Sequence, residues 1–288
     1  RRSFLHTFVD NRPLKLEDLI GAFLGEMRRR ANEHFKQDVQ NVVMGRPARF
    51  SMEDADDAFA QERLEHAARI AGFKNITFFP EPVAAAVGYE GSAKESIILA
   101  ADYGGGTSDF TVYRFGAKEF QTSDVIAIGG VSVAGDTLDA ALMRKRISHH
   151  FGTGVQYKVP FGKNVLTMPR VLMESICHPA EISLLREQDT MEFLRNVKQW
   201  SLAARDKVKM DQLFVLLDDQ LGFSLFEKIE NTKRALSKDV SAAFEFLYPG
   251  IKVREKILRT EFDEYTASDL EKIEESLDET LKKSQLTP

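Results

Sequence analysis

The chain has 288 residues, of which 43% are hydrophobic, and a formal net charge of −5 at pH 7. This length supports a large buried core and one or two domains. The mildly negative charge gives no bulk reason to bind nucleic acid or an anionic membrane, and no apolar run approaches the ~20 residues that cross a bilayer, so we expect neither partner. One cysteine, Cys177, excludes an internal disulfide and is typical of a reducing compartment, so we expect a cytoplasmic protein.

Hydrophobic periodicity and breaker residues predict mixed helices and strands in the first half of the chain. Helices are expected over Leu16–Phe35, Ala55–Ala71 and Val83–Tyr89, and again after Gly135. The expected strands are Val42–Met44, Ile76–Phe79, Ile97–Asp102, Phe110–Phe115 and Val125–Ile128. Strands and helices do not alternate regularly, which indicates a mixed α/β fold rather than a simple parallel-sheet repeat.

The second half is predicted to be mostly helical from Thr167 to about Lys238. Alternating segments at Val240–Tyr248 and Val253–Phe262, separated by Pro-Gly, predict a β-hairpin. The last helix is expected to start at TASDLEKIEE, with Ser268 and Glu271 as a capping box. Its expected buried stripe is Leu270, Ile273, Leu277 and Leu281. The chain starts without an initiator methionine or a signal-peptide pattern, and it ends just after this helix. We therefore expect it to be a piece of a longer protein.

The segment DYGGGTSD joins two predicted strands with three consecutive glycines, Gly104, Gly105 and Gly106. A dinucleotide fingerprint would continue into a helix and a P-loop would contain a lysine, so neither fits. An ordinary hairpin turn remains one interpretation. The other is an open bend in which glycine permits positive φ and bare amides bind phosphate oxygens. Asp102 and Asp109 would then flank a polyphosphate with Mg²⁺ between them, and Thr107 would add a hydroxyl.

Two further segments carry candidate binding residues. Glu81 stands between two prolines, which stiffen its backbone, so it could orient an attacking water or hold Mg²⁺ through water; a plain helix start explains it equally. Gly135 and Asp136 precede a helix whose N-terminus would favour an anion, and Asp136 could also be a cap. One polar helix face comprises Glu230, Lys233, Arg234 and Ser237, whose spacing by itself indicates a solvated face.

The remaining reactive side chains receive no functional role. Cys177 adjoins His178 without a third partner in sequence, so a structural cysteine is expected. His149 and His150 are neighbours on a predicted helix, so their rings are expected to diverge. Trp200 and the apolar residues before it are expected to belong to the core.

DYGGGTSD resembles the second phosphate loop of the 70-kilodalton heat-shock chaperones (the heat shock protein 70 family). Three more segments are similar to this family in the same order: RIAGFKNITFFPEPVAAAVGY, IENTKRALS and DVSAAFEFLYPGIKVREKILRTEFDEY. The resemblance runs from about Val42 to the C-terminus, with one long interruption. It implies the actin-like ATPase (ribonuclease H-like) α/β fold, with two lobes around a nucleotide cleft, the first lobe being incomplete. Residues 1–95 would be the remainder of the first lobe and 96–288 the second, with an outer subdomain at about 140–262.

The resemblance also implies site roles and partners. Glu81 would face the γ-phosphate and the attacking water, Asp102 and Asp109 would hold Mg²⁺ through water, and the residues at 230–237 would line the adenosine pocket. The cofactors would be ATP or ADP with Mg²⁺, and the partners protein clients and cochaperones. The family usually has asparagine where Pro80 stands and glycine where Ala134 stands, so the chain departs from the family pattern at both positions. Because further nucleotide loops would lie outside the chain, we expect it to bind ATP weakly or not at all; another actin-fold ATPase or kinase and a non-catalytic interaction module remain alternatives.

Overall fold

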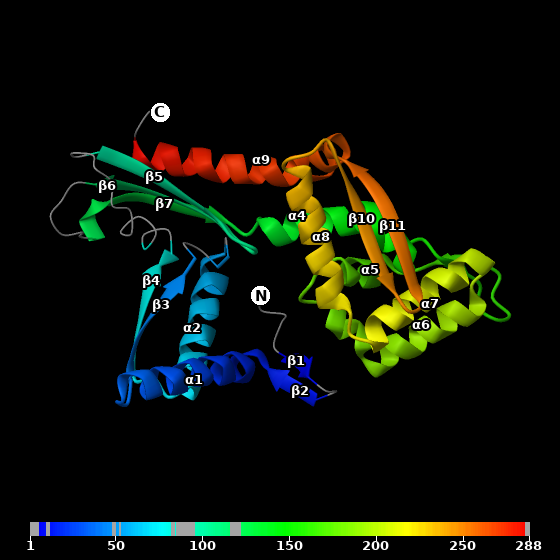
Figure 1. Ribbon diagram of the computed structural model, residues 1–288, viewed down its shortest axis with the longest axis horizontal. Coiled ribbons are helices and arrows are strands. Elements are labelled where there is room, and N and C mark those ends of the chain that lie inside the picture. Colours follow the sequence, from blue (N-terminus) through cyan, green and yellow to red (C-terminus); the bar gives the residue numbers. More distant parts are fainter. Residues whose placement is uncertain are drawn as a thin grey trace. The chain divides into compact units, whose positions relative to one another are not determined.

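The computed structural model describes residues 6–9, 12–47, 50–51, 53–81, 84, 96–115 and 122–285 (Figure 1). The chain divides into two compact units. The first consists of Arg1–Gly135 and Asp269–Pro288, and the second is Asp136–Ser268. Both units contain helices and strands, which confirms the predicted mixed α/β class.

Two helices pack against each other in the first unit. The prediction of Leu16–Phe35 as a helix (α1) is confirmed, and α2 covers Asp54–Ile70. They approach closely at Gly21, where an added Cβ would lie 2.7 Å from Cγ2 of Ile70. Phe23, by contrast, is 67% exposed, so the apolar spacing located the helix without identifying its packed face.

The described residues of the first unit also form three small sheets. β1 (His6–Val9) and β2 (Arg12–Lys15) form an antiparallel hairpin that the sequence did not indicate. β3 (Asn41–Arg46) and β4 (Asn75–Pro80) pair in parallel. The third sheet is antiparallel in the order β5-β6-β7, with bounds Ser96–Tyr103, Ser108–Phe115 and Val125–Val131. All five predicted strands are confirmed, each longer than expected. The helix predicted at Val83–Tyr89 lies outside the described residues apart from Ala84.

The C-terminal part of α9 (Arg259–Ser284) packs along the β5-β6-β7 sheet (Figure 1). Phe110 on β6, Val133 after β7 and Ile273 on α9 form a buried apolar cluster. Gly129 on β7 lets the helix approach closely, because a Cβ there would lie 1.8 Å from Oγ1 of Thr280. The sheet that carries the glycine segment is therefore supported by the last helix of the chain.

The second unit is mainly helical, as predicted. Its helices are α4 (Gly135–Leu142, whose first residue belongs to the first unit), α5 (Arg170–Ile176), α6 (Gln188–Trp200), α7 (Ala204–Asp218) and α8 (Gly222–Leu236). A π-helical turn η2 (Met143–Ile147) and the 3₁₀ turns η3 (Ser148–Phe151) and η4 (Ile182–Arg186) complete them, and η1 (Thr122–Asp124) is a 3₁₀ turn of the first unit. β8 (Gln156–Tyr157) and β9 (Leu166–Thr167) form a short antiparallel pair.

The predicted hairpin is present as β10 (Ser241–Tyr248) and β11 (Ile251–Leu258). Gly250 occupies the turn with φ +88°, a conformation that favours glycine. Buried and exposed residues alternate along both strands, so one face packs into the core of the unit. That core also holds Cys177 and the residues preceding Trp200, in agreement with the sequence expectation.

The predicted boundary between the hairpin and the last helix is wrong. β11 ends at Leu258 and α9 begins at Arg259, so Ser268 and Glu271 lie inside a continuous helix and form no capping box. The helix start is stabilised instead by Glu261, whose Oε2 accepts the Leu258 N–H at 2.9 Å. Leu270 is 41% exposed and does not belong to the buried stripe; the buried positions that replace it are Thr266, Thr280 and Ser284.

The expected divergence of His149 and His150 is also wrong. They lie in the 3₁₀ turn η3, and their side chains turn toward the same carboxylate, which the local helix geometry does not specify. Their ring centroids are 4.0 Å apart, and both rings approach Glu255. Across the described part of the chain, no helix combines the length and the apolar character needed to cross a membrane.

Candidate functional site

The glycine segment forms the turn between β5 and β6, and we call residues 104–107 the glycine loop. Asp102 pairs with Asp109 and Tyr103 with Ser108 across the two antiparallel strands. The loop is closed by the Gly104 N–H, which donates to the carbonyl of Thr107 at 3.0 Å. The Gly104, Gly105 and Gly106 residues are exposed and Thr107 is half-buried, so the loop faces solvent rather than an interior.

The expected reason for the glycines is only partly correct. None of these three residues adopts positive φ, so backbone strain does not require them. A Cβ at Gly106 would meet nothing within 4 Å, so the packing of the protein does not require glycine there either. Absence of a side chain at an open, exposed position leaves the backbone accessible to an incoming group.

Three carboxylates lie near this loop in the first unit. Asp102 is the penultimate residue of β5, Asp109 is the second residue of β6, and Glu81 follows β4. The pKa of Glu81 is raised by partial desolvation and then by the negative charges of Asp102 and Asp109. Carboxylates that disfavour each other's ionised form would gain from a cation among them.

Two glycines outside the loop make room for these acids. A Cβ at Gly45 on β3 would lie 3.0 Å from Cγ of Glu81. A Cβ at Gly130 on β7 would lie 2.6 Å from Oδ1 of Asp109, whose side chain is buried. Neither glycine was predicted from the sequence, because the role of each depends on a neighbouring strand. For Gly130 the available signal was the pair Gly129-Gly130 within a strand pattern.

The segment around Gly135 contacts the glycine loop directly. The Gly135 N–H donates to the carbonyl of Gly104 at 3.2 Å, and the Ser108 hydroxyl donates to the carbonyl of Val133 at 2.7 Å. Asp136 is exposed in the first turn of α4. The structure thus joins two candidate phosphate segments that are separated in the sequence.

The polar face of α8 lies in the second unit. Glu230, Arg234 and Ser237 are exposed, whereas Lys233 is half-buried and its Nζ lies 2.9 Å from Oδ2 of Asp139 on α4. Burial raises the pKa of Asp139 to about 6 despite this ion pair. Lys233 is therefore part of a structural pair, in contrast to the freely solvated face that its spacing indicated.

Asp139 itself was missed by the sequence analysis. Its Oδ1 is buried and has no hydrogen-bond partner among the described residues. The available signal was an acid at the start of the small apolar run Ala140–Leu142 in the predicted helix.

A family model described as "Hsp70 protein" matches residues 5–199. Among curated proteins, the chain is similar to "Chaperone protein HscA homolog" of Verminephrobacter eiseniae, with 38% identity over 128 residues, 44% of this chain and 19% of the relative. It is 34% identical to the protein of that name from Acidovorax sp. over 153 residues, 52% of this chain and 23% of the relative. "Chaperone protein HscA" of Salmonella arizonae is 37% identical over 115 residues, 39% of this chain and 17% of the relative. Each match thus spans about a fifth of the relative's length.

Proposed function

Because the chain belongs to the Hsp70 protein family, we propose that it is part of a nucleotide-binding domain that binds ATP or ADP with Mg²⁺ and hydrolyses ATP in a chaperone cycle. The observation that carries this proposal is the exposed glycine loop with the carboxylates of Glu81, Asp102 and Asp109 near it. An open row of backbone amides beside acidic groups suits a phosphate chain that arrives with a divalent cation.

The residues present fit such a cofactor. A Cβ at Gly106 would extend into open space, which bound phosphate oxygens would fill. The pKa of Glu81 is raised first by desolvation and then by the negative charges of Asp102 and Asp109, and this second cause suits a dication. When bound, Mg²⁺ would neutralise charge that develops on the phosphates.

The chain's own residues would act by positioning. The Gly104 N–H closes the loop on the Thr107 carbonyl, so the amides of Gly105 and Gly106 would donate to phosphate oxygens, with Gly104 shaping the bend and the Thr107 hydroxyl beside them. Asp102 is half-buried and more accessible than Asp109, so we assign it the closer contact with metal-bound water. Glu81 would orient the attacking water and accept its proton at a carboxylate oxygen.

The adenosine contacts are proposed on the basis of the family. Glu230, Arg234 and Ser237 are accessible on α8, where the Arg234 guanidinium could stack on a flat base. Lys233 would be oriented by its ion pair with Asp139. Gly135 and Asp136 would approach the phosphates from α4. Four further points stay predictions: a lobe boundary near residue 96, binding of protein clients, binding of cochaperones, and a cytoplasmic location.

The test is ATP binding and single-turnover hydrolysis by the complete protein that contains this chain. Glu81→Gln is expected to lower the hydrolysis rate by at least ~100-fold while ATP binding persists, because only the water-orienting group is lost. Asp102→Asn should weaken Mg²⁺-dependent binding. Glu192→Gln, the same change at an exposed position of α6 outside the proposed site, should behave as wild type.

Two results would contradict the proposal. Absence of ATP binding by the complete protein would refute the nucleotide function. Wild-type hydrolysis by Glu81→Gln would refute the assignment of Glu81 and leave another residue to orient the water.

A further inference from the structure

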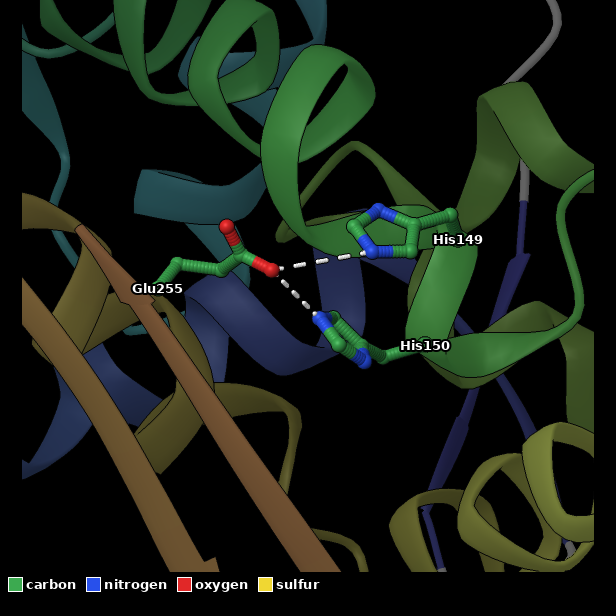
Figure 2. A group of neighbouring side chains, drawn as sticks. All are labelled: His149, His150 and Glu255. Carbon is green, nitrogen blue, oxygen red and sulfur yellow. Dashed lines mark hydrogen bonds and ion pairs between the residues drawn. The ribbon is translucent and has the colours of Figure 1, made fainter. Parts of the chain in front are cut away.

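A second cluster of ligating side chains lies in the second unit, apart from the residues assigned to the nucleotide. His149 and His150 extend from η3 toward Glu255 on β11 (Figure 2). The Oε1 atom of Glu255 lies 3.7 Å from Nε2 of His149 and 2.8 Å from Nε2 of His150. One ligand atom from each of the three residues lies within 4.8 Å of the other two.

The surrounding contacts hold this arrangement in place. Nη2 of Arg146 donates to the other oxygen of Glu255, Oε2, at 2.8 Å, so Oε1 remains directed at the two rings. The backbone carbonyl of His150 accepts a hydrogen bond from Nε2 of Gln212 at 3.0 Å. In functional metal sites, hydrogen bonds from neighbouring residues orient the side chains that bind the metal.

The local charge balance suits a cation. Arg146 is paired with two carboxylates, Glu255 and Glu261, the second at 2.7 Å. Lys209, the other cation near His149, has Asp206 as a partner at 3.2 Å. These pairs leave one net negative charge beside two imidazoles.

We propose that His149, His150 and Glu255 bind one divalent transition-metal ion of the zinc class. Two imidazole nitrogens and one carboxylate form a common three-ligand set for Zn²⁺, with a fourth position left for water. Nitrogen ligands favour Zn²⁺, Co²⁺ or Ni²⁺ over Mg²⁺, which prefers oxygen.

The geometry requires only small adjustments. Metal–ligand distances of ~2.0–2.2 Å place tetrahedral ligand atoms roughly 3.3–3.5 Å apart. The contact of Glu255 Oε1 with His149 must shorten and that with His150 lengthen by less than ~1 Å. The two ring nitrogens, which lie within 4.8 Å of each other, must adopt the same spacing, and side-chain rotation can supply these changes. The His149 side chain is 49% exposed, which provides an entry path, while Glu255 is 17% exposed and held by Arg146.

The experiment is a titration of the metal-free 288-residue chain with Co²⁺, monitored by visible absorption, followed by displacement with Zn²⁺. Wild type is expected to bind one Co²⁺ with the intense d–d bands of low-coordinate cobalt and to release it to Zn²⁺ but not to excess Mg²⁺. His149→Ala and His150→Ala are each expected to weaken binding by at least ~10-fold.

His34→Ala is the matched control, because it removes an exposed histidine from α1 in the other unit. Circular dichroism verifies that every variant is folded. Absence of stoichiometric binding to wild type would overturn the proposal. Equal affinities of His149→Ala, His34→Ala and wild type would also overturn it, and would leave His150, Glu255 and Arg146 as a hydrogen-bonded network without a metal. Because the readout does not involve nucleotide, its result is independent of the ATPase test.

Discussion

Replacing Gly129 with alanine tests the contact between α9 and the β5-β6-β7 sheet. The added Cβ would lie 1.8 Å from Oγ1 of Thr280 and 3.1 Å from its Cβ. Thr280 is fully buried, and its Oγ1 donates to the carbonyl of Ser276 at 2.7 Å. Neither the strand nor the threonine can accommodate the methyl group without a shift.

The cost follows from these contacts. Rotating Thr280 away gives up its hydrogen bond, and leaving a buried hydroxyl unpaired costs roughly 1–3 kcal/mol. Moving α9 outward instead costs about 1–3 kcal/mol, as overpacked cores do. Because either response costs about the same, we expect Gly129→Ala to lower the free energy of unfolding of the first unit by ~1–3 kcal/mol.

The assay is hydrogen exchange read by mass spectrometry, together with urea denaturation followed by circular dichroism. Amides of β7 and the C-terminal part of α9 should exchange faster than in wild type. Gly106→Ala is the control, because the same methyl group there meets nothing within 4 Å and should change stability by less than ~0.5 kcal/mol. Thr280→Ala in the Gly129→Ala background should recover part of the loss, since the nearest atom is removed.

Two outcomes would refute this explanation. An unchanged urea midpoint with unchanged protection of β7 would show that the helix does not approach Gly129 as described. A loss that Thr280→Ala fails to reduce would show that the clash lies with another residue.

Three further predictions concern the second unit. Burial raises the pKa of Asp139 from an ordinary 3.8 to about 6. Between these two pH values the native state retains a proton that the unfolded state releases. The contribution of Asp139 to the free energy of unfolding therefore falls by up to ~3 kcal/mol as the pH rises through this interval. Asp139→Asn removes this dependence; an equal difference between variant and wild type in urea denaturation at pH 4 and pH 7 would contradict it. Lys233→Met leaves the buried carboxylate of Asp139 without its cation and should lower the free energy of unfolding at pH 7 by roughly 3 kcal/mol, whereas a change below the error of the denaturation curves would show the pair to be dispensable. Burial raises the pKa of the Cys177 thiol to about 12, so a thiol reagent at pH 8 should label the native chain at least ~100-fold more slowly than the urea-unfolded chain; similar rates would show that the thiol is accessible.

The local elements and the family could be predicted from the sequence. Hydrophobic periodicity and helix- or strand-breaking residues located α1 and every strand predicted before residue 132, because these signals come from residues close together in the chain. The segment DYGGGTSD likewise indicated an exposed turn between two strands with an acid on each, and the structure has that turn. Four segments in family order carried more weight than any one motif. The family model matches residues 5–199, which include the first two of them, RIAGFKNITFFPEPVAAAVGY and DYGGGTSD.

The boundary of the last helix could not be predicted from local sequence. A capping box at Ser268 was a valid signal, but the chain reaches α9 directly from the hairpin, and Glu261 accepts the N–H of Leu258 at the true start. Leu270 fits the apolar spacing yet is exposed, because the positions that pack are decided by what the helix meets. Periodicity specifies a helix, and only its neighbours specify its buried face.

The sites depend most on tertiary structure. The sequence by itself determined which residues are acidic, which loop is bare of side chains and which family they match. Only the fold decided that Glu81 lies close enough to Asp102 and Asp109 for their charges to contribute to its raised pKa. Only the fold decided that Asp139 forms an ion pair with Lys233. Only the fold directed two adjacent histidines at a glutamate more than 100 positions away. Ion pairs and metal coordination depend on the distance between atoms. For residues remote in the sequence, that distance is set by how the chain packs and not by any local pattern.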